Sequence, residues 1–308
     1  MTIMVKAEGK KLWKTVLLTV AATLFVLLVL LPLSLSLFDG SKYGNVALIK
    51  IQGVITSDGA GSFGEDTISS TKIVEFIQDA EENSQIKAIV LEINSPGGSP
   101  VASDEIGTAV KKAKKPVVTV IREVGASGGY WIASASDYII ANKMSITGSI
   151  GVYSSFLEFS GAMEKYGVGY ERVVGGENKD IGSPYLKLSE EKKKVLQEKI
   201  DKVHTYFIQE IAANRNISES KVREIATGEF FLGSEALELG LVDELGDKET
   251  AENYLKDKYD IEDVDYVVYE SEKGLLEMLS GVISQGFFNV GEGIGAGLLK
   301  DESGVMLK

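Results

Sequence analysis

Short apolar runs alternate with amphipathic segments between residues 46 and 269 of the 308-residue chain. Apolar runs bounded by turn residues are typical of buried strands, and apolar residues at helical spacing indicate helices. Strands are predicted at Val46–Ile55, Ile86–Ile93, Pro116–Ile121 and Tyr138–Ala141, with Val242–Leu245 and Val264–Tyr269 closing the domain, and helices at Ser70–Asn83, Val101–Ala113, Tyr130–Ala135 and Ser189–Asn214. This alternation has the spacing of βαβ units, so we expect an α/β fold with a mainly parallel sheet covered by helices.

The first 38 residues follow a different pattern. Four lysines, at positions 6, 10, 11 and 14, precede an uncharged run of 24 residues, Thr15–Phe38. A helix needs about 20 apolar residues to cross a bilayer, whereas the apolar region of a signal peptide has about 7–15. We therefore predict a cytoplasmic basic segment (1–14) and a retained anchor (15–38) that crosses the cell membrane once. The rest of the chain is then extracytoplasmic. A cleaved signal sequence stays open as the alternative.

The remainder divides into one folded domain over residues 45–270 and an extension over residues 271–308. The extension is apolar and rich in glycine, but it has no long charge-free stretch, so a second membrane span is not expected. An apolar tetrapeptide near its end, Gly304–Leu307, resembles a peptide substrate and gives the hypothesis that the tail is trimmed or held by a neighbouring copy.

Composition excludes several classes of function. The formal net charge of -13 disfavours nucleic acid, whose affinity depends on lysine and arginine contacts to phosphate. The chain has no cysteine, which excludes disulfides and thiolate metal sites, and its single histidine, His204, leaves little for a multi-histidine metal site or a Ser-His pair. We expect no metal and no cofactor, and we interpret His204 as a structural or surface residue.

Two glycine-rich segments directly follow predicted strands. Asn94–Gly98 ends in two glycines whose amides can approach an oxyanion, although a Pro-Gly-Gly alone is more often a plain turn. Gly125–Tyr130 places Ser127 between a strand and a helix, where a serine hydroxyl can face a cleft and the Gly128 amide can bind an oxyanion. The commoner use of a serine at such a position is to cap the helix.

Two further segments carry no chemistry by themselves. Thr147–Val152 is a glycine-kinked strand when taken alone, and Asn178–Asp180 is a polar surface loop.

The four segments together resemble the signal peptide peptidase A family, in its short single-domain form. The resemblance covers roughly residues 45–250. It is carried by INSPGG (93–98), ASGGYW (126–131), TGSIGV (147–152), NKDIGSP (178–184) and the segment DELG (243–246). It implies a Clp-protease/crotonase-like fold of repeated ββα units and a membrane-anchored serine peptidase.

The resemblance also implies roles for five residues. Ser127 is the nucleophile and Lys179 the general base, while Ser149 holds the lysine in place. The glycines Gly98 and Gly128 supply the amides of the oxyanion hole. Ser149 is a second candidate for the nucleophile, but Ser127 is preferred.

Three neighbours of these residues also enter the prediction. Trp131 and Gly182 depart from the usual residues of the family, and neither is expected to touch the chemistry. The carboxylate of Asp180 is expected to point away from the lysine, because a nearby carboxylate favours the protonated form.

A lysine base fits a chain with one histidine. A free lysine titrates near ~10.4 and is a poor base at neutral pH, but burial disfavours its charged form. Ser-Lys pairs are a known variant of the serine protease triad. The resemblance further implies a homo-oligomer, an octameric ring in known members, with the serine and the lysine contributed by neighbouring subunits. The expected substrates are remnant signal peptides and other apolar peptides near the membrane, with a small or apolar residue before the cut.

Three alternatives remain at this point. A crotonase-like acyl-CoA enzyme would share the glycine oxyanion hole, but it predicts carboxylates at the site and a basic face for the cofactor. A non-catalytic membrane scaffold of the same fold would tolerate loss of Ser127 or Lys179. A related proteolytic family that works with a stomatin-like partner has a similar mechanism and is harder to separate.

Overall fold

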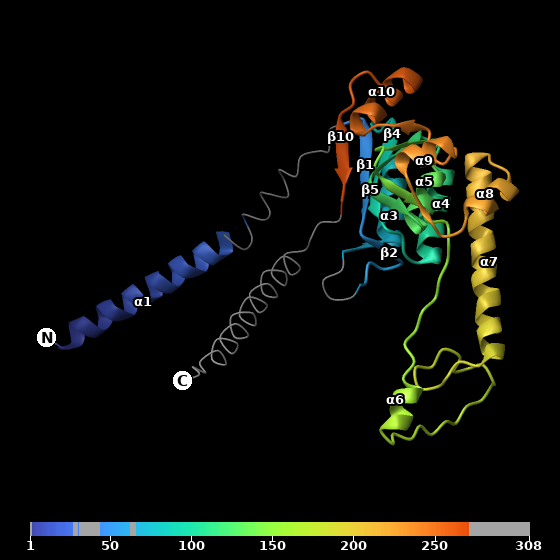
Figure 1. Cartoon of the computed structure of the whole chain (residues 1–308). Coiled ribbons are helices and arrows are strands. Elements are labelled where there is room, and N and C mark those ends of the chain that lie inside the picture. Colours follow the sequence, from blue (N-terminus) through green and yellow to red (C-terminus); the bar gives the residue numbers. More distant parts are fainter. Residues whose placement is uncertain (1, 27–29, 31–43, 62–65, 271–308) are drawn as a thin grey trace, which may run out of the picture.

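The fold is described from a computed structural model, which describes residues 2–26, 30, 44–61 and 66–270. Within these ranges one eight-stranded sheet forms the centre of the molecule (Figure 1). Its main path runs β10 (Tyr266–Tyr269), β1 (Val46–Gln52), β4 (Ala88–Ser95), β5 (Val117–Ala126), β6 (Tyr138–Ala141) and β9 (Glu244–Leu245). Every neighbouring pair on this path is parallel, which confirms the predicted α/β class.

Four shorter strands complete the arrangement within these residues. β7 (Ile146–Gly148) pairs in parallel with the end of β5 and antiparallel with β8 (Phe230–Leu232). β2 (Val54–Thr56) and β3 (Thr67–Ser69) form a separate parallel pair. The single strand predicted over 46–55 is therefore two strands, which separate at Gly53 and enter different sheets.

The described residues include nine helices. The helices are α1 (Thr2–Phe25), α3 (Ser70–Glu82), α4 (Pro100–Lys112), α5 (Gly128–Ser134), α6 (Ser160–Lys165), α7 (Glu190–Arg215), α8 (Glu219–Ile225), α9 (Gly233–Glu238) and α10 (Lys248–Tyr259). Serine caps begin α3, α4 and α7, where the side chains of Ser69, Ser99 and Ser189 accept a backbone amide.

Alternation along the strands divides the core into two clusters. On β1, Ala47, Ile49 and Ile51 belong to the larger cluster, which includes buried residues of α3, α4, α5 and α7. Val46 and Leu48 point the other way, into a smaller cluster with Ala251 and Leu255 of α10. Since successive strand residues face opposite sides, both faces of β1 are buried, as expected for a parallel strand.

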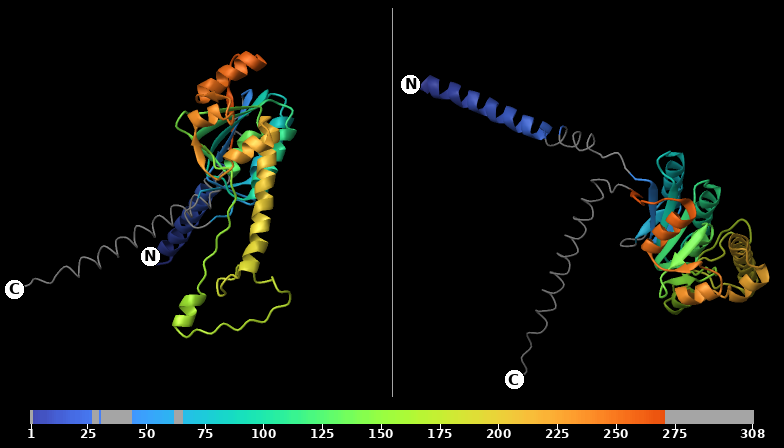
Figure 2. Two further views of the ribbon diagram at one scale, coloured as in Figure 1. Left: turned by 45° about the vertical axis from the view of Figure 1, so that its right-hand side comes forward. Right: turned by 90° about the horizontal axis from the view of Figure 1, so that it is seen from above.

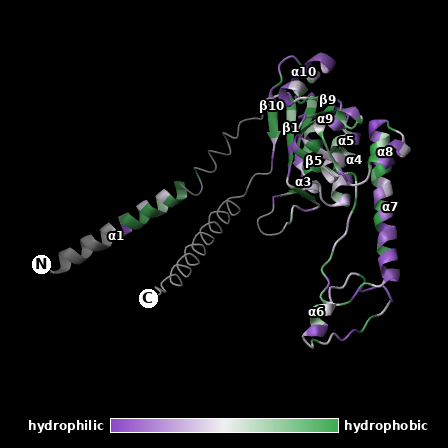
Figure 3. Ribbon diagram, viewed as in Figure 1, coloured by the Kyte–Doolittle hydropathy of each residue, from purple (hydrophilic) through white to green (hydrophobic). Residues whose placement is uncertain are grey.

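One segment of the described chain leaves this core. We call residues 152–189 the arm; it includes α6 and leads into the N-terminal end of α7. Figures 1 and 2 show it extending away from the sheet beside the far end of α7. No residue between Ile150 and Phe207 is buried, although the arm carries large apolar side chains such as Tyr153 and Val173. Figure 3 shows hydrophobic and hydrophilic positions mixed along the arm.

Several sequence predictions fall wholly or partly outside the described residues. The predicted anchor, 15–38, overlaps α1, which ends at Phe25, but positions 27–29 and 31–38 are not described. Among the helices that are described, none combines the length and apolar character needed to cross a membrane. The extension over 271–308, with its tail Gly304–Leu307, also lies outside the described residues.

A partly buried ion pair connects α7 to the loop before β9. The guanidinium of Arg215 donates to both carboxylate oxygens of Asp243, at 2.7 and 3.0 Å, and to the carbonyl of Gly240. Asp243 also accepts the backbone amide of Ile139 in β6. The side chain of Arg215 is 9% exposed and that of Asp243 is 27% exposed, so removing the arginine leaves a partly desolvated carboxylate without its charge partner.

We expect Arg215→Ala to lower the free energy of unfolding by about 3 kcal/mol. Urea unfolding of the variant and the wild type measures the difference. Lys111→Ala is the control, because the Lys111–Glu210 pair also links α7 to another helix but is more exposed, and it should cost less than about 1 kcal/mol. Equal losses in the two variants would contradict a special role for the Arg215–Asp243 pair.

Candidate active site

Three parallel strands end at the same edge of the sheet and bring the predicted site residues together. β4 leads into Gly97 and Gly98, β5 into Ser127, and β7 into Ser149. The register pairs Ser95 with Gly125 and Ala126 with Gly148. Because Ala126 and Gly148 are paired, the residues that follow them, Ser127 and Ser149, leave adjacent strands side by side.

Ser127 occupies a sharp turn between β5 and α5. Its backbone lies at φ 52° and ψ -122°, a conformation that is rare for a residue with a side chain. The turn is held by a 2.8 Å hydrogen bond from the Ser127 amide to the carbonyl of Gly148. Although Ser127 stands at the N-cap position of α5, its hydroxyl makes no capping hydrogen bond. The alternative role as a helix cap is therefore wrong, and the hydroxyl is left for the pocket.

Glycines of the β4 loop lie directly against this turn. A Cβ atom added to Gly97 would lie 2.6 Å from the Gly128 nitrogen and 2.9 Å from the Ser127 Cβ. Gly97 also has φ +100°, in the region that favours glycine. No other residue fits at position 97 without displacing the serine.

The amides of Gly98 and Gly128 lie close to each other beside Ser127. Ile55 of β2 donates to the Gly97 carbonyl and accepts from the Ser99 amide, so this bridge does not use the Gly98 amide. A Cβ added to Gly128 would lie 3.3 Å from the Gly98 nitrogen. Gly128 also begins α5, where a helix leaves its first amides without internal acceptors. The pair can therefore donate to one developing oxyanion.

Ser149 has a strained backbone as well, with φ 49°. Its amide donates to the Glu229 carbonyl at 2.9 Å, and its hydroxyl donates to the Gly228 carbonyl at 3.2 Å. The hydroxyl proton is used in that bond, and the lone pairs of the oxygen can accept a hydrogen bond from an amine. This arrangement suits a residue that positions a base better than a nucleophile.

A pocket of about 900 Å³ contains Ser127, Ser149 and Gly98 together. One wall comes from β2 and the glycine loop, and another from α7, whose contribution is Gln197, Ile200, Asp201 and His204. The Nε2 of His204 donates to the carbonyl of Ile150 at 3.2 Å. His204, interpreted from the sequence as a structural or surface residue, makes this contact to the backbone and also lines the pocket. The helical spacing of 197, 200, 201 and 204 is the sequence signal that could have identified this wall.

Lys179 is not among the residues that line this pocket. It is an exposed residue of the arm, and its amide donates to the carbonyl of Gly176 within a tight turn. Within the described residues its ammonium has no ion-pair partner. A single copy of the chain thus brings four of the five predicted site residues to one edge and leaves the fifth in the arm.

The carboxylate next to Lys179 is committed elsewhere. Asp180 accepts hydrogen bonds from the guanidinium of Arg172 and from Lys192, at 3.2 Å from the latter. Arg172 is the main cause that holds the pKa of the Asp180 carboxyl well below its usual range. Asp180 therefore fixes the local shape of the arm, bridging it to the start of α7.

Of the two residues that differ from the family's usual pattern, Trp131 lies beside the site. Trp131 lines a small cavity that also contains Ser127 and Gly128. The expectation that it does not touch the chemistry itself stays a prediction. Gly182 lies in the arm, where an added Cβ would only touch the ring of Phe156 at 3.7 Å.

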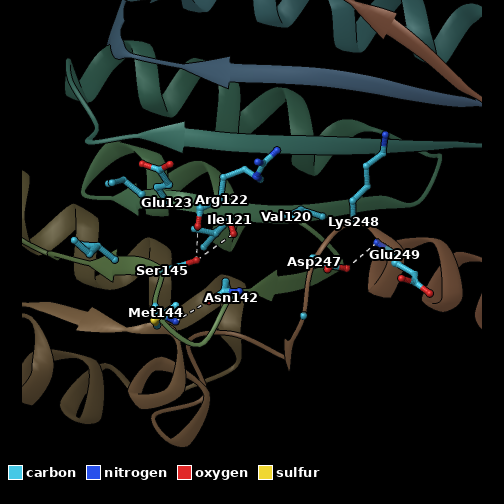
Figure 4. Close-up of a pocket in the computed structure, with 13 residues that line it drawn as sticks. Val120, Ile121, Arg122, Glu123, Asn142, Met144, Ser145, Asp247, Lys248 and Glu249 are labelled. Carbon is cyan, nitrogen blue, oxygen red and sulfur yellow. Dashed lines mark hydrogen bonds between the residues drawn. The ribbon is translucent and has the colours of Figure 1, made fainter.

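A separate pocket lies between β5, the segment that follows β6 and the start of α10 (Figure 4). Its volume is about 690 Å³. It shares no residue with the pocket around Ser127. Its serine, Ser145, donates to backbone carbonyls of Ile121 and Arg122, so the hydroxyl is engaged. Among the described residues no cluster of histidine, aspartate and glutamate has a geometry that would hold a metal ion. The edge with Ser127 is the better candidate for catalysis.

Comparison with known proteins agrees with this choice of site. The model of peptidase family S49 matches residues 109–262, and that of Clp protease matches residues 63–146. A relative from Methanocaldococcus jannaschii, named "Putative protease", is 33% identical over 87% of this chain and 88% of its own. An Enterococcus faecium relative, named "Putative signal peptide peptidase SppA", is 34% identical over 77% of this chain and 70% of its own. "Serine protease SPPA, chloroplastic" of Arabidopsis thaliana is 30% identical over 70% of this chain but only 32% of its own.

We expect Gly97→Ala to disable the serine, because the new methyl group must displace either Ser127 or the Gly128 amide. Labelling of Ser127 by a fluorophosphonate probe should slow by about tenfold or more, since small misplacements of reacting groups are costly. Intact mass after timed labelling gives the rate. Gly161→Ala is the matched control, because an added Cβ there meets no atom within 4 Å. Labelling of Gly97→Ala at the wild-type rate would show that the close packing at the turn is not needed.

Proposed function

The chain belongs to peptidase family S49 and is a serine peptidase, and from this we propose that Ser127 cleaves apolar peptides at the membrane with a lysine base, Lys179, from a neighbouring copy. The observation that carries the proposal is the contrast between the two halves of the dyad. Ser127 lies in a formed pocket with the glycine amides, whereas Lys179 lies on an exposed arm. The family match favours this reading over an acyl-CoA enzyme or a non-catalytic scaffold.

In the proposed mechanism the Ser127 hydroxyl attacks the peptide carbonyl carbon and gives its proton to the neutral lysine. The carbonyl oxygen becomes an oxyanion, which the amides of Gly98 and Gly128 stabilise. The protonated lysine then donates to the departing amine, and water hydrolyses the acyl-enzyme by the same route. Activity should rise with pH, because only the deprotonated amine accepts the serine proton.

The arm supports the idea that the lysine comes from another copy. Large apolar side chains of the arm are exposed in the single chain; Tyr153, for example, is 88% exposed and Leu157 is 72% exposed. Exposed large apolar side chains gathered on one segment favour a surface that another protein covers. A neighbouring copy packed against the arm would bury these residues and exclude water from the lysine. Repetition of such a head-to-tail contact gives a ring, of which eight subunits is the proposed number.

Ser149, on the same copy as Ser127, is proposed to orient the lysine that comes from the neighbouring copy. The Ser149 hydroxyl donates a hydrogen bond to the Gly228 carbonyl, and Ser149 lines the same pocket as Ser127. In the proposed arrangement an incoming lysine donates a hydrogen bond to the Ser149 oxygen while the lone pair of its amine faces Ser127. This fixes the amine in the orientation that proton transfer needs.

We further propose that remnant signal peptides are among the substrates. A relative that carries the signal peptide peptidase name matches 77% of this chain. The pocket wall formed by Val54, Ile55, Ile200 and Val152 offers apolar contacts to an extended apolar peptide. Signal peptides released in the membrane are apolar and lack a stable fold, so both properties suit this groove.

The proposed location is the membrane surface, through residues 15–38. The described part of this run exposes Val16, Leu17, Leu18, Val20 and Leu24 on α1. Four lysines precede the run, so the N-terminus is proposed to stay in the cytoplasm and the peptidase domain to lie outside.

We expect deletion of residues 1–43 to release the protein from the membrane while leaving the peptidase domain folded. Sedimentation of membranes after an alkaline wash, for full-length and shortened chains directed to the same compartment, gives the distribution. Retention of the shortened chain in the washed membrane pellet would contradict anchoring by residues 15–38.

Co-expression of two inactive variants tests the shared dyad. Ser127→Ala and Lys179→Ala should each lose at least about a thousandfold of the peptidase activity. Randomly mixed in one ring, they should restore about a quarter of the wild-type sites, because one junction in four joins an intact serine to an intact lysine. Hydrolysis of a fluorogenic apolar peptide by the purified mixed oligomers measures the recovery.

Two controls make the outcome specific. Co-expressing Ser127→Ala with the double variant Ser127→Ala/Lys179→Ala should restore nothing, since no intact serine is present. His204→Gln should retain most of the activity, because His204 uses its Nε2 proton on Ile150 and is not the proposed base. Full activity of Lys179→Ala alone, or no recovery in the mixture, would refute a lysine supplied between copies.

A further inference from the structure

A small cavity opens directly beside the nucleophile. It has a volume of about 100 Å³ and is bounded by Ser127, Gly128, Trp131, Val203 and Phe207, among others. In an acyl transfer the carbonyl carbon lies at the serine oxygen and the carbonyl oxygen at the glycine amides. The side chain that precedes the cut then points into this cavity. Its volume is well below the roughly 300–1,000 Å³ of ordinary ligand pockets, so it has room for one small side chain.

A larger cavity lies behind it, between α4 and α7. This outer cavity has a volume of about 430 Å³ and includes Val101, Asp104, Tyr206 and Glu210. Three residues, Pro100, Trp131 and Val203, line both cavities. Among these three, Trp131 has by far the largest side chain. Its indole therefore forms most of the partition between the cavity at the nucleophile and the outer cavity.

Packing holds this indole in one position. A Cβ atom added to Gly107 of α4 would lie 3.1 Å from the indole Cδ1 and 3.2 Å from Nε1, so α4 packs tightly against the ring there. On α7 the Phe207 ring packs against the indole with centroids 4.9 Å apart and a tilt of 36°. Trp131 is 7% exposed. A ring fixed between α4 and α7 acts as a rigid wall rather than a movable side chain.

The indole N–H adds an independent observation. Within the described structure the Nε1 of Trp131 is buried without a hydrogen-bond acceptor. Most buried indole N–H groups find a partner, and leaving one unpaired opposes folding. The position of this ring is therefore set by its shape and not by a polar contact. Replacing it with an aliphatic residue removes no hydrogen bond and leaves no group newly unpaired.

We propose that Trp131 sets the size limit for the residue before the scissile bond, so that this peptidase cleaves after small side chains and rejects aromatic ones. The inference rests on the proposed function of Ser127. With the indole in place, an aromatic side chain meets the wall before the carbonyl reaches the serine. With the indole shortened, the two cavities join and the same side chain extends into the outer one.

Two fluorogenic peptides that differ only in alanine or phenylalanine before the cut test the proposal. The wild type should prefer the alanine peptide in kcat/KM. Trp131→Leu should raise the phenylalanine-to-alanine ratio by about tenfold or more, in line with the discrimination that a few methylene groups give in an apolar pocket. Trp131→Phe, which keeps a ring against Phe207, should shift the ratio less. An unchanged ratio in a folded and active Trp131→Leu enzyme would overturn the proposal.

Tyr206→Leu is the matched control, because Tyr206 lines only the outer cavity. It should leave the ratio unchanged while Trp131 is present. A shift as large as that of Trp131→Leu would mean that the outer cavity already receives the substrate, which contradicts the role of a partition.

A binding measurement separates failure of this inference from failure of the proposed function. The chain has two tryptophans, so Trp13→Phe leaves Trp131 as the only source of indole emission. In a Trp13→Phe/Ser127→Ala variant the alanine peptide should change that emission and the phenylalanine peptide should not. If the wild type cleaves neither peptide, the proposed function fails. The difference in emission still shows whether the small cavity admits alanine and excludes phenylalanine. An equal response to both peptides would overturn the size limit.

Discussion

The site depends on one close approach of backbone to backbone at the end of the sheet. The glycine loop after β4 lies so near the turn after β5 that a methyl group on Gly97 would fall 2.6 Å from the Gly128 nitrogen. This contact brings the Gly98 and Gly128 amides together and keeps Ser127 in its strained conformation. Parallel pairing of β4, β5 and β7 makes the approach possible, because their carboxyl ends meet at one edge.

The helix α7 connects this edge to the arm that carries the proposed base. Its C-terminal part is held by Phe207 against Trp131 and by Arg215 against Asp243, deep in the protein. Its middle part lines the pocket through Asp201 and His204, and its N-terminal part leads into the exposed arm. One rigid helix thus sets the pocket wall and the direction of the arm. In the proposed assembly the same helix would determine which neighbour receives Lys179.

Local patterns in the sequence predicted most of the strands and helices, because the spacing of apolar residues and the position of turn residues depend on burial along a single element. They also pointed to Gly98, Ser127 and Gly128, which follow strands that end at the same edge, whereas the role of Ser149 came from the family resemblance. They missed His204 and Trp131, whose place in the pocket comes from packing between α4, α5 and α7, far apart in the sequence. The division of Val46–Ile55 into two strands was missed for the same reason, since β2 pairs with a distant segment, Thr67–Ser69. The role of Lys179 rests on family resemblance, because nothing near it in the chain distinguishes it from a surface lysine.

The central claim is that Ser127 of one copy meets Lys179 of another, and cross-linking measures this directly. The chain contains no cysteine, so Ser127→Cys and Lys179→Cys introduce single unique thiols. Both variants are co-expressed, treated with a short thiol-to-thiol cross-linker and analysed by mass. The account predicts covalent dimers that contain one chain of each kind, joined at these two positions. Absence of such dimers, with a cross-link forming only inside a single chain that carries both cysteines, would contradict it.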